Sequence, residues 1–179
     1  MIERERTDLS GMRCSASFSD CEAYRYLLTW RWSDAPLLVA WMLNPSTATH
    51  EVLDPTIAGL VTRARAWGRG GVRVINLFAY RATDPAEMKR RADPVGPHND
   101  YVTMQVLDSE ALLGGEVICG WGAHGGHMGR DAAAVALARR ADARLACLDT
   151  IKNGSPKHPL YIAHALTPRP WAPPAGKVP

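Results

Sequence analysis

Two short motifs, far apart in the sequence, each place a chemically capable side chain beside a proline. Asn44 follows the apolar run 37–42, and His158 follows the apolar run 145–148. The amide of Asn44 could hold a water for attack or bind a carbonyl, because an amide both donates and accepts hydrogen bonds. The imidazole of His158 could donate to a developing negative charge or shuttle a proton. Ligands bind at the carboxyl ends of strands in open α/β sheets, so we expect both side chains to line one pocket.

Two further polar residues are candidates for ligand contacts near Asn44. Ser46 belongs to the same turn. Asn76 interrupts the apolar segment 72–78, and a buried amide costs free energy unless it is hydrogen-bonded. An asparagine can also be bidentate to the edge of a nucleobase. The alternatives are a turn capped by Asn44 and Ser46, and a structural amide at Asn76 bonded to a neighbouring loop.

Three more candidates lie in loops. Tyr80 offers a stacking face, and Arg81 offers a contact to an anion. Leu160, two residues after His158, and its neighbour Tyr161 could wedge against a base or another ligand, and Leu160 is the candidate contact. The alternatives are an aromatic side chain packed over the core, an arginine paired with an acidic residue, and a surface turn.

A glycine-rich loop at 120–125 contains Trp121, a candidate ligand contact, and matches the pattern G-x-G-x-x-G after a predicted strand. A dinucleotide cofactor is therefore an alternative. Against it, the next helix begins late, near Arg130, and Asp149 lies further from the first glycine than the roughly 20 residues of that fingerprint. His124 and His127 lack a convincing third ligand for a metal. We expect neither a cofactor nor a metal.

The elements that would position these residues alternate between strands and helices. Segments 24–32 and 37–43, separated by a short polar turn, predict an antiparallel hairpin. The alternation that follows predicts a three-layer α/β sandwich with a central, mostly parallel four-stranded sheet. Beyond the hairpin, the expected strands are 72–78, 116–120 and 144–149, and the expected helices are about 55–67, 85–91, 101–113 and 130–143.

Composition indicates one globular domain. Hydrophobic residues make up 46% of the 179, enough for a single core. We expect an irregular segment at 1–22, one α/β domain at 23–166 and a loose proline-rich tail at 167–179. No apolar run approaches the roughly 20 residues of a membrane span, and the N-terminus lacks the apolar core of a signal peptide. We therefore expect a cytoplasmic protein with no membrane partner.

The charge pattern indicates anionic partners. The net charge is +3, and basic residues gather at 63–73, 89–91 and 139–144. A basic face attracts nucleic acid or phosphorylated ligands, although a solvated helix face is the alternative for any one cluster. The expected partners are nucleic acid or a nucleotide, and the oligomeric state stays open.

Several motifs together resemble an uncharacterised bacterial and phage domain family of unknown function. The resemblance covers roughly residues 24–165. Its motifs here are L-N-P-S-T-A, D-P-T, N-L-F-A-Y-R-A-T-D-P, G-P-H-N-D, G-W-G and P-K-H-P-L-Y. Their order is also similar, more distantly, to the uracil-DNA glycosylase superfamily, and that similarity implies a fold of the same kind.

The distant resemblance implies a role for four residues. Asn44 corresponds to the water-activating position and Asn76 to the asparagine that reads the base. His158 corresponds to the histidine that stabilises the departing base, and Leu160 to the wedge. The chain departs from the superfamily at Met42, where glycine is common, at Ser46-Thr47, and in reading H-P-L where H-P-S is usual.

The leading hypothesis is therefore hydrolysis of an N-glycosidic bond of a modified base or nucleotide. An alternative is a non-catalytic module that binds a nucleotide or nucleic acid in the same pocket. A third hypothesis is a dinucleotide-cofactor enzyme that works through the loop 120–125.

Overall fold

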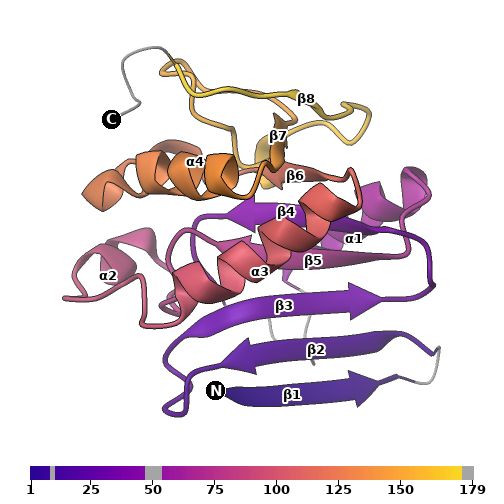
Figure 1. The fold of residues 1–179 in the computed structure, drawn as a ribbon, viewed down its shortest axis with the longest axis horizontal. Coiled ribbons are helices and arrows are strands. Elements are labelled where there is room, and N and C mark those ends of the chain that lie inside the picture. Colours follow the sequence, from indigo (N-terminus) through magenta and orange to yellow (C-terminus); the bar gives the residue numbers. More distant parts are fainter. Residues whose placement is uncertain (9–10, 47–53, 175–179) are drawn as a thin grey trace.

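A computed structural model describes residues 1–8, 11–46 and 54–174 (Figure 1). It is an α/β structure built on one mixed sheet of eight strands in the order β1-β2-β3-β5-β4-β6-β7-β8. The strands are β1 (Ile2–Thr7), β2 (Arg13–Phe18), β3 (Arg25–Arg31), β4 (Leu37–Met42), β5 (Gly71–Asn76), β6 (Glu116–Cys119), β7 (Arg144–Cys147) and β8 (Arg169–Pro170). The α-helices are α1 (Pro55–Ala66), α2 (Pro85–Lys89), α3 (Asn99–Leu112) and α4 (Arg130–Arg140).

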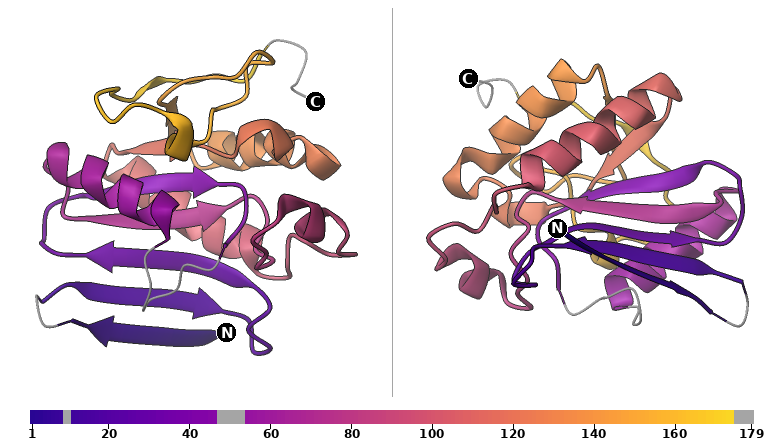
Figure 2. Two further views of the ribbon diagram at one scale, coloured as in Figure 1. Left: turned by 180° about the vertical axis from the view of Figure 1, so that it is seen from behind. Right: turned by 60° about the horizontal axis from the view of Figure 1, so that its bottom comes forward.

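Four neighbouring strands in the middle of the sheet run parallel. β4 pairs with β5 on one side and β6 on the other, and β7 pairs with β6. Every residue of β4 is buried, as expected for a strand covered on both faces. Helix α1 packs on one face of the sheet, while α3 and α4 pack on the other (Figures 1 and 2).

The chain changes direction across the sheet at β4. The connection through α1 leads to β5 on one side of β4, and the connection through α2 and α3 leads to β6 on the other side. The carboxyl ends of the three strands lie together, because Met42 is in register with Asn76 and Trp41 with Cys119. Such a reversal of strand order opens a crevice at the carboxyl edge of a parallel sheet.

The predicted hairpin of segments 24–32 and 37–43 is not formed. β3 pairs antiparallel with β5, which lies between β3 and β4. Gly70, directly before β5, contributes to this arrangement: its carbonyl accepts hydrogen bonds from the backbone N–H groups of Trp32 and Ser33, at 2.8 and 3.1 Å. A Cβ atom at Gly70 would lie 2.7 Å from the carbonyl oxygen of Ser33, so no larger residue fits there.

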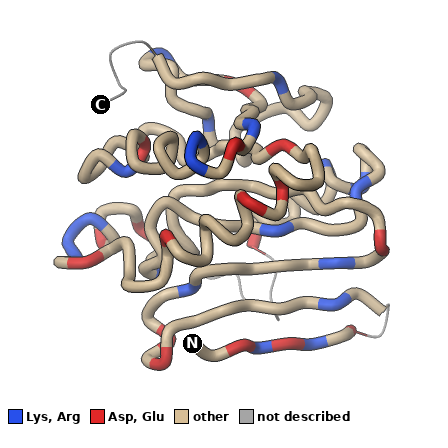
Figure 3. Tube along the Cα trace, in the orientation of Figure 1, with Lys and Arg blue, Asp and Glu red and all other residues tan. Residues whose placement is uncertain are grey.

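The prediction that residues 1–22 are irregular is wrong. β1 and β2 form an antiparallel pair that extends the sheet beyond β3. Cys14, Ala16 and Phe18 are buried, a period of two that is typical of a strand. β1 is the edge strand, and acidic and basic residues alternate along it (Figure 3). Charges of this kind keep an exposed edge from pairing with other chains.

The segment after residue 167 is also less loose than predicted. β8 pairs antiparallel with β7 at the opposite end of the sheet from β1. The indole N–H of Trp171 donates to the carbonyl of Gly154 at 3.0 Å. Residues 175–179 of the predicted tail lie outside the described residues. None of the helices in the described part of the chain has the length and apolar character needed to cross a bilayer.

Candidate functional site

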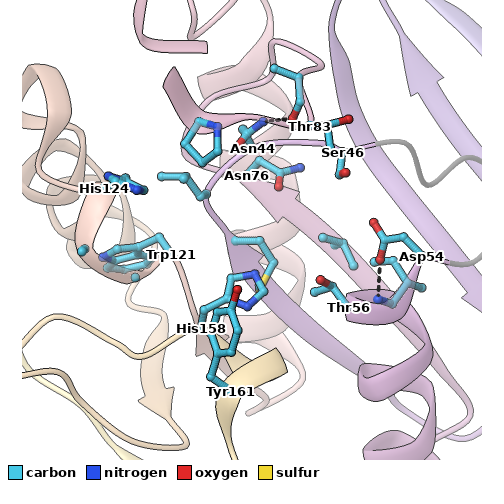
Figure 4. Close-up of a pocket in the computed structure, with 18 of the residues that line it drawn as sticks. Asn44, Ser46, Asp54, Thr56, Asn76, Thr83, Trp121, His124, His158 and Tyr161 are labelled. Carbon is cyan, nitrogen blue, oxygen red and sulfur yellow. Dashed lines mark hydrogen bonds between the residues drawn. The ribbon is translucent and has the colours of Figure 1, made fainter. Parts of the chain in front are cut away.

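A cavity of about 570 Å³ opens at the carboxyl edge of the parallel strands (Figure 4). Five of the eight residues that the sequence singled out line it: Asn44, Ser46, Asn76, Trp121 and His158. They come from the ends of different parallel strands or the loops that follow, so the fold brings together positions far apart in sequence. Thr47, which follows Ser46 in its motif, lies outside the described residues.

Asn44 is half-buried in the turn that follows β4. Its side-chain N–H₂ group donates to the carbonyls of Pro45 and Ala82, at 3.0 and 2.7 Å. These bonds tie the turn to the loop after β5 and fix the orientation of the amide. With both N–H groups engaged, the side-chain oxygen Oδ1 is the atom of Asn44 suited to bind a water or another donor.

Asn76 is the last residue of β5 and is only 1% exposed. Its backbone is held firmly: Nδ2 of Asn99 donates to the carbonyls of Asn76 and Leu77, both at 3.0 Å. Nε of Arg130 also donates to Leu77, at 3.1 Å, and Arg130 forms an ion pair with Asp100 at 2.6 Å. In contrast, the side-chain N–H₂ of Asn76 has no hydrogen-bond partner among the described residues. A rigid backbone therefore presents an unsatisfied donor at the cavity.

His158 faces the cavity from the loop that follows β7. Its Nδ1 accepts the backbone N–H of Leu160 at 3.3 Å, just before a 3₁₀ turn at Pro159–Tyr161. Burial lowers the pKa of His158, and the negative charge of Asp54 opposes that shift. The ring is therefore neutral near pH 7, and because Nδ1 accepts, its proton is on Nε2. His158 can act as a neutral hydrogen-bond donor.

The loop that carries His158 is held against α1 by Arg63. This buried guanidinium donates to the carbonyls of Pro159, Ile162 and Ala163, at 3.3, 2.6 and 3.1 Å. Sequence reasoning placed Arg63 in a basic cluster. Its helical position was overlooked: Arg63 lies on the same buried face of α1 as Ile57. Arg63 is thus a structural anchor for the site.

Trp121 packs deep in the wall of the cavity. Its ring lies edge-on to those of Trp41 and Trp171, with centroids 5.9 and 5.4 Å apart. Two glycines of the loop 120–125 have packing roles. A Cβ atom at Gly125 would overlap the Trp121 ring, and one at Gly120 would lie 2.8 Å from Cδ of Pro159. Packing accounts for these glycines without a phosphate, which weakens the case for a dinucleotide cofactor.

Three predicted contact residues are not among those that line this cavity. Tyr80 packs edge-on against Tyr24, and the guanidinium of Arg91 lies over its ring at 4.6 Å. Arg81 donates to the carbonyl of Glu22 at 3.0 Å. Tyr80 and Arg81 instead line a shallower neighbouring depression that shares Ser46 with the cavity.

Leu160 is 47% exposed and is not among the residues that line the cavity, whereas the neighbouring Tyr161 is. The ring of Tyr161 lies 5.8 Å from that of His158, centroid to centroid. Of the two residues that could wedge against a ligand, Tyr161 therefore lines the cavity beside His158 and Leu160 does not.

Three charged residues that line the cavity were not predicted as site residues: Arg25, Asp54 and Lys157. Arg25 is the first residue of β3 and is buried; burial lowers its pKa to about 10, and Asp54 opposes that shift. Asp54 is the N-cap residue of α1 and also lines the cavity. The signal for Arg25 was a charged residue directly before the apolar residues 26–28 of β3. Within the described ranges, no group of three or more His, Cys, Asp or Glu residues is placed to hold a metal ion.

A family model described as "Protein of unknown function (DUF1643)" matches residues 25–160. No curated protein and no solved structure matches the chain. The matched range contains every residue that lines the cavity except Tyr161, and it leaves out β1, β2 and β8.

Proposed function

The chain belongs to the DUF1643 family, and from that premise we propose that it recognises a nucleobase or nucleotide in the cavity and hydrolyses an N-glycosidic bond of a modified base or nucleotide. The proposal includes a distant relationship of fold and mechanism to the uracil-DNA glycosylase superfamily. The residues that carry it are Asn44, Asn76 and His158.

The observation that carries the proposal is the unsatisfied amide of Asn76. A buried donor without a partner costs about 1–3 kcal/mol, and this cost is removed when a ligand supplies an acceptor. Nucleobase edges carry carbonyl oxygens and ring nitrogens that accept such bonds. Asn76 lines the cavity, and the network of Asn99 and Arg130 fixes its backbone, which supports a role in binding the edge of a flat heterocycle.

The three side chains together suit a reaction in which the base departs as an anion. The Nε2–H of His158 would donate to the base as negative charge develops on it. The fixed amide oxygen of Asn44 would position the attacking water. Hydrogen bonds that are already oriented toward developing charge lower a barrier without a strong base. A nucleotide in duplex DNA would first have to leave the helix, at a cost of a few kcal/mol.

A second candidate function is binding without catalysis. The bonds that Asn44 donates to Pro45 and Ala82 are a sufficient structural reason for an asparagine there. In that case the cavity would hold a base or nucleotide through Asn76 and His158, and the glycosidic bond would stay intact.

One assay separates the two candidates. The protein is incubated with DNA, RNA and free nucleosides that carry uracil, hypoxanthine or alkylated bases, and released base is measured by mass spectrometry. We expect release by the native protein and none by Asn76→Leu, which replaces the amide with an apolar side chain of similar size. Tight binding of a free base with no release from any substrate would contradict hydrolysis and support the binding module.

A further inference from the structure

We infer that Asp54 is a catalytic residue of this site: its carboxylate stabilises positive charge on the sugar and takes the proton of the attacking water. The inference rests on the proposed hydrolysis and adds to it the group that completes the reaction. Asp54 lies outside the two proline-flanked motifs that contain Asn44 and His158.

Asp54 lies in the cavity wall, directly before α1 and across from Trp121 and His124 (Figure 4). One carboxylate oxygen, Oδ1, accepts the backbone N–H of Ile57 at 2.8 Å, which holds the side chain in place. The other oxygen, Oδ2, takes no part in that bond. Among the described residues that line the cavity, Asp54 is the only carboxylate.

The charge of Asp54 acts across the cavity. It raises the pKa values of Arg25 and His158 against the lowering that burial causes at both residues. The carboxylate is therefore within electrostatic reach of the histidine proposed to stabilise the base. The cavity thus holds a negative charge, suited to the sugar end of a breaking N-glycosidic bond, and a neutral hydrogen-bond donor, suited to the base end.

A carboxylate would add to the reaction a negative charge and a proton acceptor, neither of which Asn44 supplies. An amide oxygen orients a water but is a poor proton acceptor. In the first step the bond between C1′ and the base nitrogen breaks, and its electron pair leaves with the base, so the sugar becomes cationic. Asp54 stabilises that cation as a fixed negative charge.

In the second step the water oxygen forms a bond to C1′ with one of its electron pairs. The protonated hydroxyl that results is a strong acid, and it transfers its proton to the Asp54 carboxylate. Asp54 then returns the proton to solvent, and the departed base takes a proton from solvent. The net change is addition of one water across the N-glycosidic bond.

The other titratable groups of the cavity are less suited to this role. The ammonium of Lys157 is cationic and lies 3.8 Å from Asp149. His124 is exposed, and its Nδ1 accepts from Nζ of Lys89 at 3.0 Å. His158 is assigned to the base, and its Nδ1 already accepts the backbone N–H of Leu160. Asp54 is left as the group that combines negative charge with proton affinity.

The test uses Asp54→Asn, because asparagine keeps the N-cap hydrogen bond while the charge is lost. The probes are two DNA oligonucleotides with an abasic-site analogue, one a cationic pyrrolidine and the other a neutral tetrahydrofuran. We expect the native protein to bind the cationic probe at least about tenfold more tightly, since opposite charges a few ångströms apart attract strongly in a partly buried site. Asp54→Asn should bind both probes equally.

The matched control is Asp84→Asn. Asp84 is also an N-cap residue, of α2, and accepts the N–H of Ala86 at 2.8 Å, but it does not line the cavity. This variant should keep the native preference. The inference is overturned if the native protein binds both probes equally or if Asp54→Asn keeps the preference.

Base release separates this inference from the proposed function. If the native protein releases a base, we expect kcat and kcat/KM for Asp54→Asn to fall together by roughly 100-fold, as for an interaction made only in the transition state. Equal rates for the two proteins would overturn the role of Asp54 and leave the proposed hydrolysis intact. No release by the native protein from any substrate would overturn both.

Discussion

Replacing Asn76 with leucine should make the ligand-free protein more stable while it abolishes ligand recognition. Asn76 is 1% exposed, and its N–H₂ group has no partner in the described part of the chain. Leucine has a similar volume and no polar atom. The substitution therefore removes a desolvated donor without opening a cavity of significant size.

The size of the effect follows from the cost of one unsatisfied amide. That cost is about 2 kcal/mol, the middle of the usual range. For a chain of this length each kcal/mol moves the thermal midpoint by roughly 2–4 °C, so we expect a rise of roughly 4–8 °C. The gain holds only without ligand, because an acceptor on the ligand stabilises the native protein and not the variant.

The assay is thermal unfolding followed by circular dichroism, with Asn99→Leu as the matched control. Asn99 is also fully buried, and its Oδ1 has no hydrogen-bond partner among the described residues, but its Nδ2 donates to the carbonyls of Asn76 and Leu77. Its replacement removes one donor from each of these buried carbonyls, of which Leu77 keeps the bond from Arg130, so the midpoint should fall. If Asn76→Leu lowers the midpoint as Asn99→Leu does, the amide of Asn76 is satisfied within the protein and the argument for a ligand fails.

Three further predictions test the structure around the site. Gly125→Ala should lower the free energy of unfolding by about 1–3 kcal/mol, because the new Cβ meets the ring of Trp121. The control Gly126→Ala, whose Cβ would have no contact shorter than 3.6 Å, should change that free energy by less than about 0.5 kcal/mol. Urea unfolding measures both variants, and equal effects would contradict the packing role of Gly125. Arg63→Lys should cost about 3 kcal/mol in the same measurement, since one ammonium cannot replace a guanidinium bonded to three carbonyls, and an unchanged stability would show that these bonds contribute little. Burial lowers the pKa of His158 in the folded state below its ordinary 6.5. The stabilising contribution of neutral His158 is therefore present above pH 6.5 and is lost as the pH falls toward the folded-state pKa. His158→Gln should flatten the dependence of stability on pH between about pH 7 and 5, and an unaltered slope would contradict the lowered pKa.

Local pattern was enough to find the edge of the sheet where the site lies. Asn44 and Asn76 each end or follow an apolar run, and a run of this kind marks a buried parallel strand. The carboxyl ends of parallel strands lie at one edge, so residues at those ends converge even when they are distant in sequence. His158 was expected at the same edge, and it is among the residues that line the cavity.

Local pattern was insufficient where contacts with a distant segment of the chain determine the position of a strand or the environment of a side chain. The segments 24–32 and 37–43 have the pattern of a hairpin, yet β5 lies between them in the sheet. The close backbone contacts at Gly70 and Gly71 that accompany this pairing are seen only in the assembled sheet. Arg63 looks like a surface charge until the loop it binds is placed against α1. Asp54 looks like a helix cap until the cavity beside it is seen.

By itself the sequence determined the α/β class, the family motifs and the strand ends that carry Asn44, Asn76 and His158. These features follow from local composition, because an apolar run indicates a buried strand and a proline indicates the turn beside it. Only the tertiary structure decided the order of the strands, the unsatisfied state of the Asn76 amide and the presence of Asp54 in the same cavity. The physical reason is that hydrogen-bond satisfaction and electrostatic reach depend on which groups come within a few ångströms of one another. That proximity arises from contacts between segments distant in the chain, which no local pattern records.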